Sequence, residues 1–146
     1  MKEYRFYGWQ TADVLPQNPR YAAVGTPRDL YDRMRNIWCR ESCAPRLRPQ
    51  WSETNRTVGQ CSITSFLVQD IYGGQVYGIP LEEGGFHCYN VVGDCVFDLT
   101  SEQFGDKVLC YEGNPEQLRE VQLAPEEKRL RYEYLVDALQ RSLGLE

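Results

Sequence analysis

Apolar residues recur at helical spacing in three stretches of the chain, and each stretch predicts a helix. The first runs from Leu30 to Trp38 and follows Thr26-Pro27-Arg28-Asp29, which has the capping hydroxyl, the early proline and the carboxylate of a helix start. The second covers Cys61 to Tyr72 and ends at Gly73-Gly74. The third lies between Ala124 and Leu143, with one apolar stripe made of Leu130, Tyr134, Ala138 and Leu139.

Between the second and third helices, β-rich runs predict a small antiparallel sheet. Gln75 to Leu81 is a short strand, followed by a turn at Glu82-Glu83-Gly84-Gly85. Phe86 to Val92 and Cys95 to Leu99 are two further strands, and the two-residue loop Gly93-Asp94 between them is of the type that closes a hairpin.

A tight turn fixes the register of this hairpin, with Val92 opposite Cys95, Tyr89 opposite Asp98 and His87 opposite Thr100. One face is then largely apolar and points inward, and it holds Phe86, Cys88, Val92, Cys95, Phe97 and Leu99. The other face holds His87, Tyr89, Asp98 and Thr100.

The remaining segments complete a single α+β domain over residues 1–146, the size expected for one core. Residues 1–25 form an irregular N-terminal arm, 26–124 the core and 125–143 the C-terminal helix. Glu41 to Val58 is polar and broken by prolines, which predicts a long loop. Thr100 to Gln103 predicts a short helical turn, and Lys107 to Tyr111 a further strand.

Charge restricts the classes of partner. The net charge of −5 argues against nucleic-acid binding by the whole domain. Six arginines lie between Arg33 and Arg56 against Glu41 and Glu53. They form either a solvated face or a surface that guides an anionic substrate or partner toward Cys61.

No stretch of the chain is apolar enough for a signal peptide or a membrane span, so we expect a cytoplasmic protein without membrane contact. In that compartment the six cysteines are expected to be reduced. Cys88 and Cys95 are not cross-strand partners in the hairpin register, so no disulfide is expected between them.

Three residues have the side chains of a cysteine nucleophile, its base and the group that orients the base. Cys61 opens a helix, where the unpaired amides and the dipole favour a thiolate. His87 is the chain's only histidine, and Asp98 is its diagonal neighbour on the same hairpin face. The alternatives are a buried apolar cysteine and a structural histidine–aspartate pair.

Other residues have weaker claims on the site. The Gln60 amide and backbone N–H groups at the helix start are candidates to receive an oxyanion, and Trp51 and Tyr89 either line a substrate pocket or simply pack. Cys39 and Cys43 have the spacing of a metal-binding or resolving pair. Without a second pair at zinc-finger spacing, no metal is expected, and the chemistry requires no cofactor.

Four ordered motifs resemble the bacterial YunG family of uncharacterised proteins. They are Trp51-Ser52-x-Thr54-Asn55-x-x-x-Gly59-Gln60-Cys61-Ser62-x-Thr64, Val68-Gln69-Asp70-x-x-Gly73-Gly74, His87-Cys88-Tyr89-Asn90 and Asp98-Leu99-Thr100-Ser101-Glu102-Gln103-Phe104. More distantly, the chain is similar to papain-like hydrolases of the transglutaminase-like and NlpC/P60 types. That likeness implies a helix opened by the nucleophile and packed on an antiparallel sheet, with Cys61 as nucleophile, His87 as base and Asp98 as orienter.

The expected function is therefore a cysteine hydrolase or acyltransferase that acts on an amide, ester or thioester in a small-molecule or peptide substrate. Two alternatives remain. One is a binding or regulatory domain that holds an acidic partner with the arginine-rich loop. The other is a thiol redox sensor that pairs Cys61 with Cys39 or Cys43.

Overall fold

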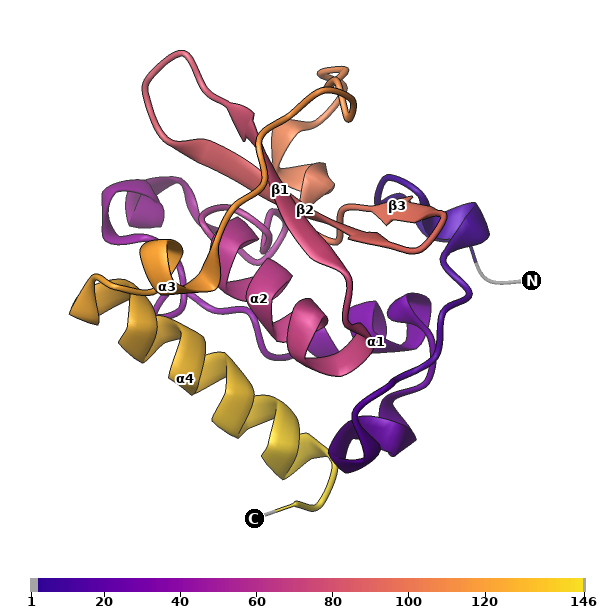
Figure 1. Cartoon of the computed structure of the whole chain (residues 1–146). Helices are drawn as coiled ribbons and strands as arrows, with labels where there is room; N and C mark the ends of the chain where they lie inside the picture. The colour runs from indigo at the N-terminus through magenta and orange to yellow at the C-terminus, as the bar shows by residue number, and fades with distance from the viewer. Residues whose placement is uncertain (1–2, 146) are drawn as a thin grey trace.

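A computed structural model describes residues 3–145 as an α+β structure around a three-stranded antiparallel sheet in the order β1-β2-β3 (Figure 1). The strands are β1 (Gln75–Pro80), β2 (Phe86–Val92) and β3 (Cys95–Phe97). The helices are α1 (Pro27–Met34), α2 (Cys61–Tyr72), α3 (Arg119–Gln122) and α4 (Glu126–Ser142). Four 3-10 turns are η1 (Trp9–Thr11), η2 (Pro19–Val24), η3 (Pro45–Gln50) and η4 (Ser101–Phe104).

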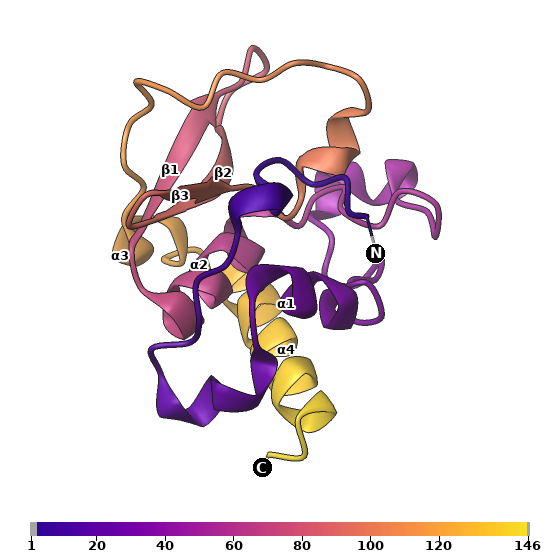
Figure 2. The ribbon, with the colours of Figure 1, turned by 90° about the vertical axis from the view of Figure 1, so that its right-hand side faces the viewer.

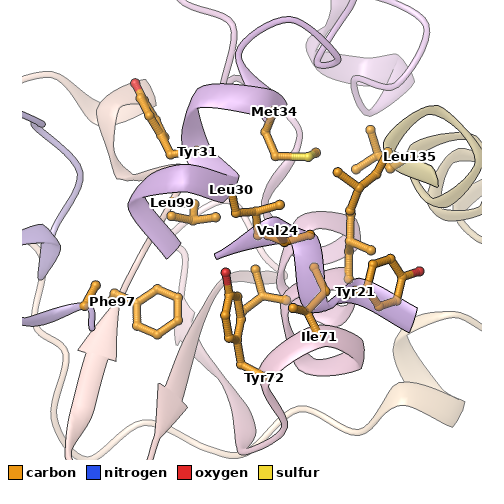
Figure 3. Packing of buried hydrophobic residues seen from close by; sticks show 14 of the residues in the cluster. Tyr21, Val24, Leu30, Tyr31, Met34, Ile71, Tyr72, Phe97, Leu99 and Leu135 are labelled. Carbon is orange, nitrogen blue, oxygen red and sulfur yellow. The ribbon is translucent and has the colours of Figure 1, made fainter. Parts of the chain in front are cut away.

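Helix α2 is the centre of the molecule, because it lies between the sheet and α4 in both views (Figures 1 and 2). Its bounds are those predicted, and Gly73, with a φ of 80°, ends it. Ile63, Leu67 and Ile71 are fully buried in the main core. Figure 3 shows Ile71 and Tyr72 in one cluster with side chains from the N-terminal arm, α1, β3 and α4.

Helix α1 begins as predicted but ends early. The Thr26 hydroxyl accepts from the backbone N–H of Asp29, and the Asp29 carboxylate accepts from the backbone N–H of Thr26. The predicted helix reached Trp38, whereas α1 ends at Met34 and the chain then turns. Trp38 is still fully buried, because its indole N–H donates to the Thr64 hydroxyl on α2 at 2.9 Å.

The hairpin register is confirmed at Val92 and Cys95, and the ladder continues to Asn90 opposite Phe97. The predicted strand to Leu99 is two residues too long. Asp98 leaves the ladder because its N–H donates to the carbonyl of Tyr7 in the N-terminal arm at 3.0 Å. The expected ladder pairs of Tyr89 with Asp98 and of His87 with Thr100 are therefore not formed.

Both faces of the hairpin are covered. Cys88, Val92, Phe97 and Leu99 are buried toward the helices as predicted, but Phe86 is 38% exposed at the start of β2. His87 and Tyr89 on the other face are buried too, His87 against Phe104 of η4 and Tyr89 against Tyr111 of the segment that follows η4. That segment contains Lys107 to Tyr111, which is not the predicted strand, since the Tyr111 ring turns back to stack on Tyr7.

The N-terminal arm is irregular as predicted and packs on the core through Phe6, Ala12 and Tyr21. In the C-terminal helix the predicted stripe is wrong at Leu130 and Tyr134, which are exposed. The buried face of α4 is instead centred on Leu135 and Leu139, together with an arginine whose guanidinium donates to a carbonyl of the 41–58 loop. Within residues 3–145, no helix combines the length and apolarity that a membrane span requires.

Candidate active site

The Cys61 thiol lies where α2 meets the start of β2. Its Sγ donates to the carbonyl of Phe86, the residue before His87, at 3.8 Å, and the side chain is half-buried. The first backbone N–H groups of a helix have no intrahelical acceptor, and the helix dipole is positive at that end. Position alone therefore favours a negative charge on this sulfur.

His87 and Asp98 form a buried pair, although the hairpin ladder from which their proximity was predicted ends at Phe97. Nε2 of His87 lies 2.5 Å from Oδ2 of Asp98, and each side chain is 1% exposed. The other ring nitrogen, Nδ1, is buried and makes no hydrogen bond within residues 3–145. The edge of the imidazole packs against the Phe104 ring, with 4.7 Å between centroids. The ring is thus fixed, with one nitrogen left over.

Four donors hold the Asp98 carboxylate. Oδ2 also accepts from the Tyr111 hydroxyl at 2.7 Å, and Oδ1 accepts from the backbone N–H and the hydroxyl of Thr100 at 3.1 and 3.3 Å. Thr100 is used here instead of capping η4, which lacks a side-chain cap. The carboxylate orients His87 through a position set by the Tyr7 pairing rather than by a continuing ladder.

The electrostatics of the site favour a thiolate and an imidazolium. Burial lowers the pKa of His87, but the charge and hydrogen bond of Asp98, with smaller contributions from Cys61, outweigh it and raise the pKa to about 10. A hydrogen bond from the Cys88 thiol is the largest influence on Cys61. Burial opposes it and His87 reinforces it, so that the pKa of Cys61 falls well below its ordinary value.

Cys88 is a site residue that sequence reasoning missed. Its side chain is 1% exposed and packs with Phe66, Val76 and Leu123. Its hydrogen bond to Cys61, followed by burial, raises the pKa of Cys88 well above the ordinary value. Its place on the hairpin face that carries α2 was available as a signal, because α2 begins with Cys61.

Tyr111 was missed as well, and no spacing pattern points to it. Its hydroxyl donates to Asp98, and its ring stacks on Tyr7 at 3.8 Å between centroids. Burial first, and then the negative charge of Asp98, raise the pKa of Tyr111, so the hydroxyl stays protonated and remains a donor.

The weaker site candidates, Gln60, Tyr89 and Trp51, already have hydrogen-bond partners within the protein. Gln60 is fully buried, with its amide oxygen accepting from the Ser42 hydroxyl and its amide nitrogen donating to the Cys39 carbonyl. Tyr89 donates to the Tyr111 carbonyl and accepts from an asparagine amide. Trp51 packs with Cys43 and Val58, and its indole N–H donates to a backbone carbonyl.

The arginine-rich loop is held together by its own arginines. Arg40 donates to the Trp51 carbonyl and Arg56 to the Trp38 carbonyl, and both guanidinium groups lie near the Trp51 ring. Arg48 donates to the carbonyls of Arg40 and Glu41. These contacts favour a role for the three arginines in building the loop.

The six cysteines are free. Cys39 lies beside the hydroxyls of Ser42 and Tyr134, whereas Cys43 is fully buried next to Gly59. Within residues 3–145, no three residues of the histidine, cysteine, aspartate and glutamate types come together in a way that would hold a metal ion.

Comparison with known proteins places the chain in a family. The model of the family described as YunG protein matches residues 26–144. The chain belongs to the YunG family. A family relative, "Uncharacterized protein YunG" of Bacillus subtilis (strain 168), is 30% identical over 111 residues, which cover 76% of this chain and 89% of the relative. No solved structure matches this YunG-family chain.

Proposed function

We propose that this YunG-family chain is a cysteine-dependent hydrolase or acyltransferase acting on an amide, ester or thioester. The observation that carries the proposal is the buried His87–Asp98 pair beside the Cys61 thiol, which engages Nε2 and leaves Nδ1 without a hydrogen bond to any group of residues 3–145. A purely structural histidine in a 1% exposed position is expected to have both nitrogens paired. The unpaired nitrogen is the one that can exchange a proton with sulfur.

In the proposed reaction, the Cys61 thiolate attacks the substrate carbonyl carbon, and a C–S bond forms as the carbonyl π electrons move to oxygen. Collapse of this intermediate breaks the bond to the leaving group, which takes a proton from the His87 imidazolium. Water, or the acyl acceptor of a transferase, then attacks the thioester while His87 takes its proton. Cys61 leaves again as a thiolate.

The developing oxyanion would be received by backbone N–H groups of the first turn of α2, which have no intrahelical acceptor. The Gln60 amide already has a partner on each side, which favours a role in joining the residue 39–42 turn to the start of α2. A helix opened by the nucleophile and packed on an antiparallel sheet supports a papain-like arrangement as part of this proposal.

The decisive experiment is iodoacetamide labelling read residue by residue by mass spectrometry across pH. Cys61 should label with a midpoint below the ~8.5 of an ordinary thiol. In His87→Gln the midpoint should move up toward that value. Exposed Cys110 provides an internal control in the same sample, and its labelling should be unchanged by the substitution. An ordinary Cys61 midpoint that ignores His87→Gln would overturn the proposal.

A direct test of chemistry uses p-nitrophenyl acetate as a generic acyl donor. Release of p-nitrophenol should be accompanied by an acetyl group on Cys61 in intact-mass and peptide spectra. Cys61→Ser and His87→Gln should both lose it. Acetylation spread over lysines, with none on Cys61, would count against an acyl-enzyme.

The contact between Cys61 and Cys88 favours a second candidate, a thiol redox sensor. Hydrogen peroxide would oxidise the Cys61 thiolate to a sulfenic acid, and attack by the Cys88 sulfur would form a disulfide and release water. Non-reducing peptide mapping after mild peroxide should find Cys61 joined to Cys88 and not to Cys39 or Cys43. Oxidation of Cys61 to a sulfenic or higher acid without a Cys61–Cys88 disulfide would rule this candidate out.

A further inference from the structure

A cavity lies beside the candidate active site, and none of the roles above uses it. Its volume is about 750 Å³, and it opens between the N-terminal arm, α1, residues 53–57 and η4. Neither Cys61 nor His87 lines it. Phe104 does, and the same ring packs against His87, so the cavity and the thiol centre share one wall.

An unsatisfied hydroxyl marks the wall of this cavity. Thr57 lines it and is 4% exposed, and its Oγ1 has no hydrogen-bond partner within residues 3–145. Buried hydroxyls are nearly always paired, because an unpaired one loses its bonds to water without replacement. A hydroxyl can both donate and accept, so a polar ligand that reaches Oγ1 from the cavity would restore what burial removed.

The lining carries charges of both signs, and two of the charged side chains lie beside the Tyr31 ring. The Glu102 carboxylate accepts from the Tyr31 hydroxyl, and the guanidinium carbon of Arg35 lies 5.9 Å from the Tyr31 ring centroid. The Arg35 side chain is exposed and has no ion pair within the described residues. Tyr31, Trp38 and Phe104 add apolar wall. The lining therefore offers separate places for an anion and a cation.

We propose that this cavity binds a small zwitterion, an α-amino acid or a dipeptide. Its carboxylate would pair with Arg35 and its ammonium group with Glu102. The peptide group of a dipeptide, or one of the charged groups of an amino acid, would reach Thr57 Oγ1. This site goes beyond the proposed chemistry of Cys61 and does not depend on it. Because Phe104 lines the cavity and also packs against His87, a ligand bound in the cavity should change the surroundings of the His87 ring.

The test is calorimetric titration of the full chain with L-alanine and with L-alanyl-L-alanine. At least one of the two should bind, and the stronger one reports the ligand length that the cavity accepts. Blocking the dipeptide at both ends, as N-acetyl-L-alanyl-L-alanine amide, should weaken binding about tenfold or more, since both ion pairs are lost. No binding of either zwitterion at tens of millimolar, or equal binding of the blocked dipeptide, would overturn the proposal.

Thr57→Val isolates the hydroxyl with little change of shape. It should weaken zwitterion binding several-fold and leave the melting temperature of the free protein unchanged or higher, because the hydroxyl it removes is unpaired. The matched control is Thr11→Val, on the exposed η1 turn outside the cavity, which should bind as wild type. Equal binding by Thr57→Val and wild type would also overturn the proposal.

The same titration in Cys61→Ser separates this site from the catalytic proposal. Binding should persist there, and the single histidine resonance of wild type should shift on addition of the zwitterion. Loss of binding in Cys61→Ser would place the ligand at the thiol and contradict a separate cavity site. Failure of the acyl-transfer experiments with binding intact would affect the proposed function alone.

Discussion

Two aspartates, Asp98 and Asp70, make similar contacts with different consequences. Asp98 accepts from His87 and Tyr111 beside the start of α2. Asp70, in the last turn of α2, accepts from an arginine and a tyrosine, Arg119 and Tyr132. Each carboxylate thus has one basic and one phenolic partner.

The difference lies in what the basic partner has left over. Arg119 also donates to the Phe66 carbonyl, to Gln69 and to the Tyr132 hydroxyl, so its guanidinium joins α2, α3 and α4. A guanidinium does not give up its proton in proteins, whereas an imidazole does. His87 keeps one nitrogen free next to a thiol. The carboxylate of Asp98 therefore orients a group that can transfer a proton, whereas the carboxylate of Asp70 only joins helices. The basic partner of each carboxylate makes this difference.

The largest expected effect is on the titration of His87. Its imidazole gives the only histidine signal in the NMR spectrum, and this signal should titrate near a pKa of about 10. Asp98→Asn should bring the pKa down by more than one unit toward the ordinary ~6.5. Asp70→Asn should leave it in place. A wild-type midpoint near the ordinary value would erase the difference between the two aspartates.

The raised pKa of His87 also predicts the direction in which the stability of the protein changes with pH. Folding raises the pKa of His87 from an ordinary 6.5 to about 10. The stabilisation that comes from protonated His87 is therefore complete at pH values below 6.5. It is lost as pH rises toward 10. Urea unfolding of wild type and His87→Gln at several pH values should therefore give a stability difference that shrinks between neutral and strongly alkaline pH. A difference that grows over this range would contradict the assigned direction.

Thiol reactivity should separate the two aspartates next. At pH 7, Asp98→Asn should slow iodoacetamide labelling of Cys61 about tenfold or more, because each unit of upward pKa shift costs up to tenfold in thiolate. Asp70→Asn should change it less than about twofold, since Asp70 touches no group at the thiol. Equal slowing by both variants would indicate loss of the fold rather than loss of the orienting carboxylate.

Asp70 should matter for the stability of the protein rather than for the reactivity of Cys61. Asp70→Asn removes the charge that joins α2 to Arg119, and both side chains are partly exposed. The free energy of unfolding should fall by about 1 kcal/mol, a modest value because solvent screens such a pair. Urea denaturation measures it, with Asp137→Asn on the exposed part of α4 as the control. An unchanged midpoint would mean that the three-helix junction does not depend on this charge.

Local patterns predicted the elements that carry the site, and long-range contacts decided the rest. The bounds of α2, the Gly93-Asp94 hairpin and the capping box of α1 depend on neighbours in sequence, so they could be predicted. The end of β3 at Phe97 could not, because Tyr7, far away in the chain, takes the hydrogen bond of the next residue. The burial of Tyr89 depends likewise on Tyr111, which lies in a segment without regular structure.

The candidate triad was accessible from sequence because its members lie at recognisable places, a helix start and a tight hairpin. Cys88 was left out of the predicted site because it lies on the hairpin face opposite to His87. At the start of β2, a side chain on the helix-covered face and one on the opposite face can both approach the first residue of α2. Tyr111 comes from an irregular segment, where no periodicity tells which side chain turns inward.

The smallest expected effect compares the two tyrosines. Tyr111→Phe removes one hydrogen bond to a carboxylate and should lower the free energy of unfolding by about 1 kcal/mol. Tyr132→Phe removes one such bond and also the acceptor of Arg119, so its cost should be about the same or somewhat larger. Only Tyr111→Phe should also shift the His87 imidazole resonance, because only Tyr111 shares a carboxylate oxygen with that ring. Thermal unfolding and one NMR spectrum per variant are sufficient. If both variants move the resonance, or neither does, the carboxylate of Asp98 is not the link between Tyr111 and His87.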